Sequence, residues 1–195
     1  MNTDISPDPA PETNKAGKKN KSFWLDTLQT VVFAVLIFLA INTITLRVRV
    51  YNISMRPTLE PGYFVLVNRL AYKWAEPGHG DVIVFHHQGN PKEDYVKRVI
   101  GLPGDTVDIT DGNVFVNGTR LNEPYIMEPA FYNESYLVPP NSFFVLGDNR
   151  NDSSDSHSWG YVKDEWVVGK ALLIYWPFNQ VKLLSIPDLV SAQQP

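Results

Sequence analysis

The chain has 195 residues and a mass of 22.1 kDa, enough for one domain and a short appendage. A hydrophobic content of 44% excludes a wholly disordered chain, and the net charge of -4 argues against a nucleic-acid-binding protein, which normally carries a basic excess. The chain contains no Cys, which excludes disulfide scaffolds, cysteine nucleophiles and thiolate zinc sites.

Residues 1–22 are polar and rich in proline at their start, and they show no apolar periodicity. They end in a basic cluster that consists of Lys15, Lys18, Lys19 and Lys21. Such a segment has no apolar face with which to join a core. We therefore expect a disordered, basic tail over residues 1–22.

Residues 23–46 predict one transmembrane helix. The stretch 31–41 is apolar without interruption, and as a helix the whole segment would span about 36 Å at ~1.5 Å per residue. It lacks the polar stripe of a buried core helix, and no small-residue cleavage site of a secretory signal follows it.

The charges on either side of this helix predict its orientation. Four lysines precede it, whereas only Arg47 and Arg49 follow it closely. Because positive charge is retained on the cytoplasmic side, the tail is expected in the cytoplasm and residues from 47 onward outside it.

Residues 47–180 predict an all-β soluble domain of several small antiparallel sheets in a coiled arrangement. Runs of strand-forming residues occupy 48–51, 63–67, 81–85, 142–146 and 171–176, and residues 113–121 form a hairpin pattern with Asn-Gly at its turn. No long amphipathic helical pattern follows residue 47. Residues 181–195 are too short and polar for a second span and are expected to form a C-terminal tail.

The four histidines are poorly placed for catalysis or metal binding. His86 and His87 are adjacent in a predicted strand and so point to opposite faces, while His79 and His157 lie in a turn and a polar loop. No G-x-S-x-G sequence places a triad serine. We predict neither a metal nor a cofactor.

Three segments concentrate unusual residues: SMRPTL at 54–59, YVKRVIGLPGD at 95–105 and GDNRNDSSDS at 147–156. Each taken alone has an ordinary explanation, as a turn, a surface strand and a solvated loop. The exception is Lys97, which strand alternation places on one face with Tyr95 and Val99. A lysine on an apolar face must reach solvent, pair with an acid or lose its charge.

In these three segments the sequence resembles bacterial type I signal peptidases, membrane-anchored proteases that remove signal peptides from exported proteins. The resemblance covers about residues 24–178 and follows the order of the family's motifs. It implies Ser54 as nucleophile, Lys97 as general base and Ser153 as the residue that orients the lysine.

The resemblance also implies two supporting charge pairs, one between Arg98 and Asp148 and one between Asp155 and the residue two positions later. That residue is His157, where the family usually has arginine. Because histidine has an unperturbed pKa of ~6.5, it would lose much of its charge above neutrality, which puts the role of Asp155 in question.

Lysine can act as a base only when it is neutral. Its ordinary pKa of ~10.4 keeps it protonated at neutral pH, and burial lowers the pKa of a lysine by up to ~3–5 units. Lys97 would then deprotonate Ser54, and the Ser54 backbone N–H would help to bind the oxyanion. Asn52 is either a second oxyanion donor or a plain turn residue, and the sequence leaves both open.

The substrate is expected to bind as an extended strand, with small side chains entering shallow apolar pockets. Ile53, Met55 and Val96 are the candidates for lining these pockets, and the family implies alanine at the first and third positions before the cut. The expected partners are signal peptides of exported preproteins, the lipid bilayer and the secretion translocon, with no nucleic acid.

Two alternatives remain from the sequence. A self-cleaving serine-lysine protease of the SOS-repressor type shares the two catalytic residues, but it is soluble and carries a DNA-binding domain. A non-enzymatic, membrane-anchored β module would leave the position of Lys97 without purpose. Asn52 begins an N-x-S sequon, and glycosylation there would block Ser54, which favours a bacterial plasma membrane.

Overall fold

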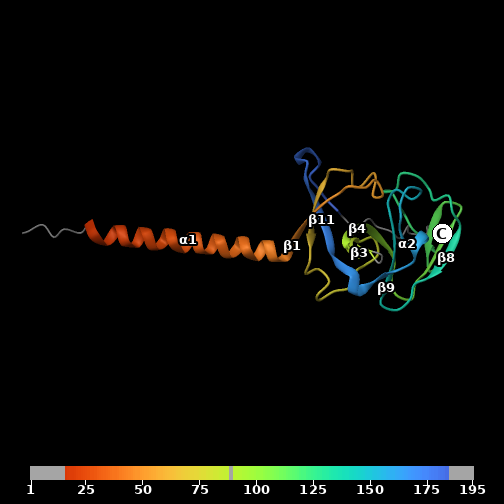
Figure 1. Cartoon of the computed structure of the whole chain (residues 1–195), viewed down its shortest axis with the longest axis horizontal. Coiled ribbons are helices and arrows are strands. Elements are labelled where there is room, and N and C mark those ends of the chain that lie inside the picture. Colours follow the sequence, from red (N-terminus) through yellow and green to blue (C-terminus); the bar gives the residue numbers. More distant parts are fainter. Residues whose placement is uncertain (1–15, 88–89, 185–195) are drawn as a thin grey trace, which may run out of the picture. The chain divides into compact units, whose positions relative to one another are not determined.

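The computed structural model describes residues 16–87 and 90–184. The chain divides into two units, of which the first ends at Thr43 and the second begins at Ile44 (Figure 1). The predicted N-terminal tail lies outside the described residues up to residue 15, and so does the predicted C-terminal tail from residue 185.

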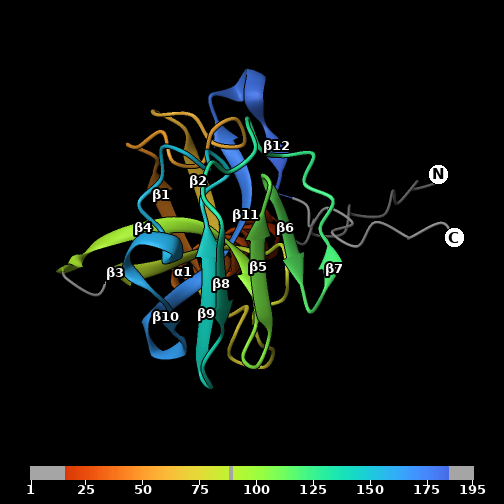
Figure 2. The ribbon, with the colours of Figure 1, turned by 90° about the vertical axis from the view of Figure 1, so that its right-hand side faces the viewer.

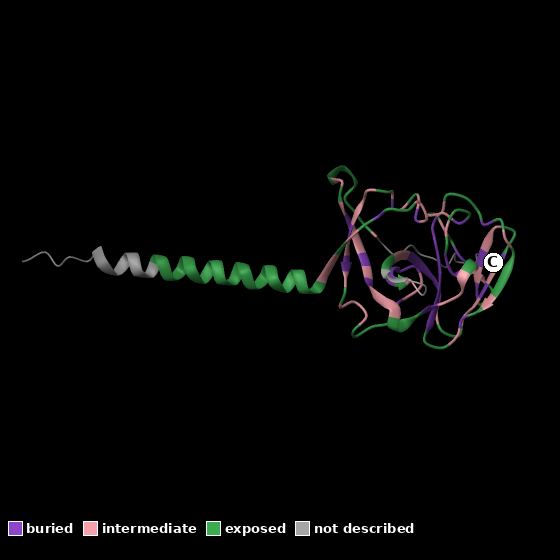
Figure 3. Cartoon of the chain, in the orientation of Figure 1, coloured by how far each residue is buried: buried purple, intermediate pink, exposed green. Residues whose placement is uncertain are grey.

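The first unit contains one long helix, α1 (Ala16–Ile44). Its segment Phe23–Ile44 has a mean hydropathy of 2.1 and is long and apolar enough to cross a membrane. Figure 3 colours the residues of this segment as exposed. The hydroxyls of Thr27, Thr30 and Thr43 donate to carbonyls four residues earlier in α1, which satisfies them inside the helix.

The ends of α1 differ from the predicted boundaries. The helix begins at Ala16, inside the segment 1–22 that was expected to be disordered, and it ends at Ile44 rather than at residue 46. Thr45 and Leu46 instead begin the first strand, where they pair with Asn68 and Val67. Backbone pairing in a sheet therefore ends the helix before its apolar sequence ends.

The second unit contains an eight-stranded sheet in which every described neighbour pair is antiparallel. Its strands lie in the order β1 (Thr45–Arg49), β2 (Phe64–Asn68), β11 (Val167–Trp176), β3 (Val82–His87), β4 (Asn90–Gly101), β9 (Ser142–Leu146) and β10 (Val162–Lys163), with β12 (Lys182–Leu183) paired to β11.

A four-stranded antiparallel sheet completes the unit, with the order β7 (Thr119–Arg120), β6 (Asn113–Val116), β5 (Thr106–Thr110) and β8 (Glu134–Leu137) (Figure 2). The predicted hairpin is confirmed between β6 and β7. Its turn residues Asn117 and Gly118 have φ values of 52° and 77°, as a two-residue hairpin turn with an Asn-Gly sequence requires.

The all-β class is confirmed, although the strands gather into one large and one smaller sheet. Strands β5 and β8 were not predicted, and β12 lies in the expected C-terminal tail. The first strand ends at Arg49, so Val50 and Tyr51 lie outside it, contrary to the sequence pattern. The described residues after β9 also include three short helices: α2 (Ser156–Trp159), η1 (Asp164–Trp166) and η2 (Phe178–Gln180).

The core is organised around β9, all of whose residues are buried. Phe143 and Val145 pack in one apolar cluster, whereas Phe144 and Leu146 pack in another with residues of the smaller sheet. Because both faces of this strand are covered, its sequence is continuously apolar instead of alternating. The strand β4, which carries Lys97, pairs with β9.

Candidate active site

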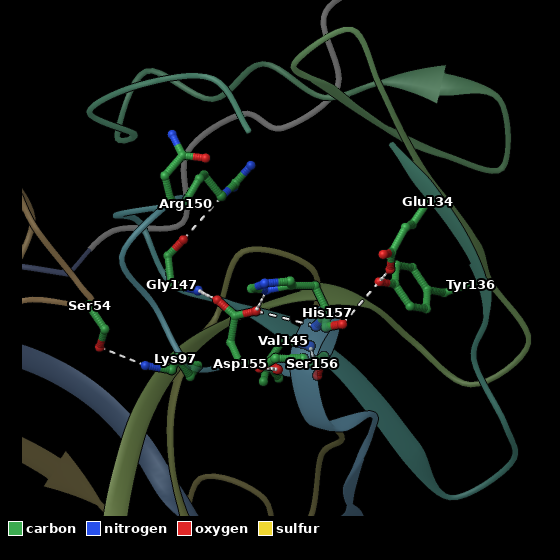
Figure 4. A network of polar contacts seen from close by, with 12 residues as sticks. Ser54, Lys97, Glu134, Tyr136, Val145, Gly147, Arg150, Asp155, Ser156 and His157 are labelled. Carbon is green, nitrogen blue, oxygen red and sulfur yellow. Dashed lines mark hydrogen bonds and ion pairs between the residues drawn. The ribbon is translucent and has the colours of Figure 1, made fainter. Parts of the chain in front are cut away.

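The structure brings Ser54 and Lys97 together from two of the three unusual segments. The Lys97 Nζ donates a hydrogen bond to the Ser54 Oγ at 2.6 Å (Figure 4). Ser54 lies in a turn over residues 53–56, which the Arg56 N–H closes by donating to the Ile53 carbonyl at 3.0 Å. This turn, the Ser54 turn, positions the Ser54 hydroxyl next to the Lys97 amine.

Lys97 is almost completely buried, with only 3% of its surface exposed. It lies in β4 opposite Ile83 of β3, a fully buried residue. Burial lowers the pKa of Lys97 to about 8, although the carboxylates of Asp155 and Asp148 act in the opposite direction. The amine therefore loses its proton more than two pH units earlier than an ordinary lysine does.

Gly147 and Asn149 contact the Ser54 turn at its backbone carbonyls. The Asn149 backbone N–H donates to the Ser54 carbonyl at 3.0 Å, and the Asn149 side-chain Nδ2 donates to the Ile53 carbonyl at 3.3 Å. A Cβ at Gly147 would lie 2.4 Å from the Ser54 carbonyl oxygen and 2.2 Å from the Ser153 Oγ. Only glycine allows this close approach.

Ser153 lies against Gly147, and its Oγ is buried without a hydrogen-bond partner among the described residues. The orienting role that the resemblance implies for Ser153 would require a bond to Lys97. In this structure the Lys97 amine donates to the Ser54 hydroxyl. The role of Ser153 stays a prediction.

Arg98 and Asp148 form a buried, two-pronged ion pair. The Arg98 Nε and Nη2 donate to the two Asp148 carboxylate oxygens at 2.8 and 2.7 Å, and Nη1 donates to the Gly80 carbonyl. Arg98 follows Lys97 in β4, so their side chains point to opposite faces of the strand. The ion pair thus ties β4 to the start of residues 147–156 without occupying the face that carries Lys97.

A second buried ion pair was not predicted from the sequence. The Arg150 guanidinium, 1% exposed, donates to both Glu123 carboxylate oxygens at 2.5 and 3.0 Å and to the Gly147 carbonyl at 3.0 Å. Tyr125 connects the two pairs, since its ring lies 3.9 Å below the Arg98 guanidinium and its hydroxyl donates to Glu123. Arg150 was visible within the GDNR sequence, but no local signal marks the distant Glu123 as its partner.

Asp155 and His157 form the pair in which histidine replaces the family's arginine. The His157 Nδ1 lies 2.7 Å from one Asp155 oxygen, and the other oxygen accepts the Gly147 N–H at 2.8 Å (Figure 4). The hydrogen bond to Asp155 raises the pKa of His157, against the opposing effect of burial. The imidazole also stacks on the Tyr132 ring at 4.3 Å.

A groove of about 280 Å³ opens beside Ser54 and Lys97. The predicted pocket residues Ile53, Met55 and Val96 all line it, together with Asn52. Asn52 is exposed and lies in the loop after β1, two residues before Ser54. The remaining lining residues are Val48, Arg49, Val50, Tyr51, Asp94, Tyr95, Asp152 and Ser154.

The other three histidines each contact a residue other than Ser54 or Lys97. His86 bonds Asp94 at 2.8 Å, His79 bonds Asp105 at 2.7 Å, and His87 stacks on Tyr95. Over the described parts of the chain, no group of three or more His, Asp or Glu side chains is arranged to hold a metal ion.

Comparisons with known proteins assign the family. The profile described as "Signal peptidase, peptidase S26" matches residues 24–176. The chain therefore belongs to the signal peptidase family. Signal peptidase I of Leptolyngbya laminosa is 40% identical over 196 aligned residues, which cover 93% of this chain and 97% of that relative.

A probable signal peptidase I-2 of Synechocystis sp. is 38% identical over 169 residues, 83% of this chain and 78% of its own. A solved signal peptidase I from Enterococcus faecalis V583 aligns with a TM-score of 0.46 and 34% identity, over 49% of this chain and 96% of that one. Membership in the family makes the chain a serine-type peptidase. This family membership supports the signal peptidase hypothesis over the SOS-repressor-type protease and the non-enzymatic β module.

The Asp155–His157 pair predicts a pH-dependent stability in this signal peptidase. The folded-state pKa of His157 is raised above its unfolded value, so the pair stabilises the fold fully below about pH 6.5 and loses that contribution as pH rises through the folded-state pKa. In His157→Arg the charge persists, so its melting temperature relative to wild type should increase with pH above 6.5. Thermal unfolding between pH 5 and 9 measures this difference.

His157→Gln provides the opposite comparison, because it removes the charge at every pH. Its deficit relative to wild type should be largest at low pH and shrink as the pH rises. Three parallel curves of melting temperature against pH would show that the charge of His157 contributes nothing.

Proposed function

We propose that this chain is a membrane-anchored endopeptidase that cleaves N-terminal signal peptides from exported preproteins, with Ser54 as nucleophile and Lys97 as general base. The observation that carries the proposal is the 2.6 Å hydrogen bond between the Ser54 hydroxyl and an amine whose pKa burial has lowered to about 8. The family membership and the curated relatives named signal peptidase I support the same substrate class.

The reaction follows from these two groups. Neutral Lys97 accepts the Ser54 hydroxyl proton as the oxygen attacks the scissile carbonyl, and the Ser54 N–H stabilises the resulting oxyanion. Collapse of this intermediate transfers the proton from the Lys97 ammonium to the leaving amine and forms an ester on Ser54. Lys97 then deprotonates a water molecule that attacks the ester, and its ammonium returns the proton to the departing Ser54 oxygen as the signal peptide is released.

The substrate strand would bind along β4. This strand pairs with β3 from Asp94 to Arg98, but its pairing with β9 begins only at Arg98. On the β9 side, residues 94–97 therefore offer backbone groups to an added strand along the groove. Alternate substrate side chains would face Ile53, Met55 and Val96, which favours small residues of the A-x-A type.

The bilayer and the translocon are the further partners of this proposal. Segment Phe23–Ile44 would form a single-pass anchor in a bacterial plasma membrane, and residues 47–180 would form the catalytic domain outside the cytoplasm. The β11–β12 connection adds an exposed apolar cluster of Trp176, Phe178, Val181 and Leu183 that is suited to lipid contact. A translocon would deliver the preprotein to this enzyme.

Removal of either reacting group should abolish cleavage of an A-x-A preprotein in detergent. We expect Ser54→Ala and Lys97→Met to lose at least about 10³-fold in turnover with the fold retained, since the two residues act as one unit. Lys97→Arg should also be inactive, because its guanidinium stays protonated. Lys163→Met, at an exposed lysine outside the groove, is the control and should keep wild-type turnover. Activity in Ser54→Ala would refute the nucleophile assignment.

The pH profile gives a second measure of the same pair. In the wild type, kcat/KM should rise with pH and level off above about 8, where Lys97 is neutral in the free enzyme. A flat profile between pH 6 and 9 would contradict Lys97 as the base.

Asn52 is proposed as the second oxyanion donor, since it lines the groove together with Ser54. Loss of one such donor lowers the rate by ~10²–10³-fold, so Asn52→Ala should lose turnover at nearly unchanged KM. Asn52→Ser should recover part of the loss, because a hydroxyl also donates. Steady-state kinetics with melting temperatures separates this role from that of a turn residue. Near-wild-type turnover in Asn52→Ala would leave the backbone N–H as the only donor.

The orientation is tested by protease accessibility. Protease added outside sealed spheroplasts should digest residues after 47, while a tag on the N-terminal tail stays protected. Digestion of the tag with protection of the catalytic domain would reverse the topology.

A further inference from the structure

Asn149 contacts the Ser54 turn at two successive carbonyls. Its backbone N–H bonds the Ser54 carbonyl at 3.0 Å and its side-chain amide bonds the Ile53 carbonyl at 3.3 Å. Its own position is fixed on both sides, because Asp148 and Arg150 are each held in a buried ion pair. Asn149 is therefore a fixed support against which the turn rests.

The bonded carbonyls determine where the N–H groups of the turn point. In a planar trans peptide, the C=O of one residue and the N–H of the next point in opposite directions. The Ile53 carbonyl is directed toward Asn149 and the Arg56 N–H, which both donate to it. The Ser54 N–H consequently points away from them.

We propose that Asn149 is a positioning residue of the oxyanion hole. Its side-chain amide holds the Ile53 carbonyl, and its backbone N–H holds the Ser54 carbonyl. Together they keep the Ser54 N–H aimed at the oxyanion in the groove. This inference rests on the proposed role of Ser54 as nucleophile.

The Ser54 turn packs directly against residues 147–149, because Gly147 has no side chain to separate them. The Ser54 carbonyl approaches so near to Gly147 that a Cβ there would lie 2.4 Å from it. The turn therefore presses onto residues 147–149 with no room for a larger side chain between them. A carboxylate at position 149 would place an acceptor against the Ile53 carbonyl and push that peptide from its orientation.

The test compares Asn149→Asp and Asn149→Ala with Asn151→Ala. Asn151 is a matched control, because its side chain also donates to a backbone carbonyl, that of Pro129 at 2.9 Å, but does so away from the Ser54 turn. Turnover is measured together with inhibition by two peptides of the same sequence. One is a peptide aldehyde, whose hemiacetal with Ser54 has a tetrahedral carbon that carries the former carbonyl oxygen; the other is the product peptide, which forms no adduct.

We expect both Asn149 variants to lose about tenfold or more in kcat, up to the ~10²-fold loss of an oxyanion donor. Their affinity for the aldehyde should fall by a similar factor, whereas KM and the affinity for the product peptide should change by less than about twofold. Asn151→Ala should match the wild type in all four quantities.

Several outcomes would overturn the inference while leaving the proposed function intact. These are wild-type kcat in Asn149→Asp, an equal loss of affinity for aldehyde and product peptide, or a comparable loss of kcat in Asn151→Ala. Asn149→Asp keeps the size of the side chain and decides the question if Asn149→Ala does not fold. A wild-type enzyme without Ser54-dependent cleavage would instead refute the proposed function itself.

Discussion

The burial of one lysine is the constraint on which the rest of this site depends. An ammonium group at 3% exposure has lost most of its hydration, and this loss favours the neutral amine. Asp155 and Asp148 act against it, yet the pKa still falls to about 8, so desolvation is the larger effect. The interior around β4 therefore converts an ordinary cation into a group that accepts a proton near neutral pH.

The opposing carboxylates each have their own hydrogen-bond and charge partners. Asp148 is matched by the Arg98 guanidinium, and Asp155 is shared between the Gly147 N–H and His157. Buried charges of this kind are tolerated only when they are paired and hydrogen-bonded. The pairing also gives the segment after β9 a single geometry, and that segment holds the Ser54 turn.

Histidine in place of arginine changes one partner of this arrangement from a permanent to a titratable cation. The contact with Asp155 persists at 2.7 Å, and stacking on Tyr132 adds an aromatic contact on the ring face. The hydrogen bond raises the pKa of His157, so the pair keeps its charge to a higher pH than an isolated histidine would. We therefore expect the stability contributed by this pair to depend on pH.

The sequence by itself determined the apolar helix, the all-β class, the Asn-Gly hairpin and the unusual position of Lys97, because these depend on composition, periodicity and local turn chemistry. It did not place the end of α1, where pairing of Thr45 and Leu46 with β2 overrides apolarity. Nor did it find the Arg150–Glu123 pair or the support of the Ser54 turn by Asn149. Those contacts join residues far apart in the chain, and only the tertiary fold brings them within hydrogen-bonding distance.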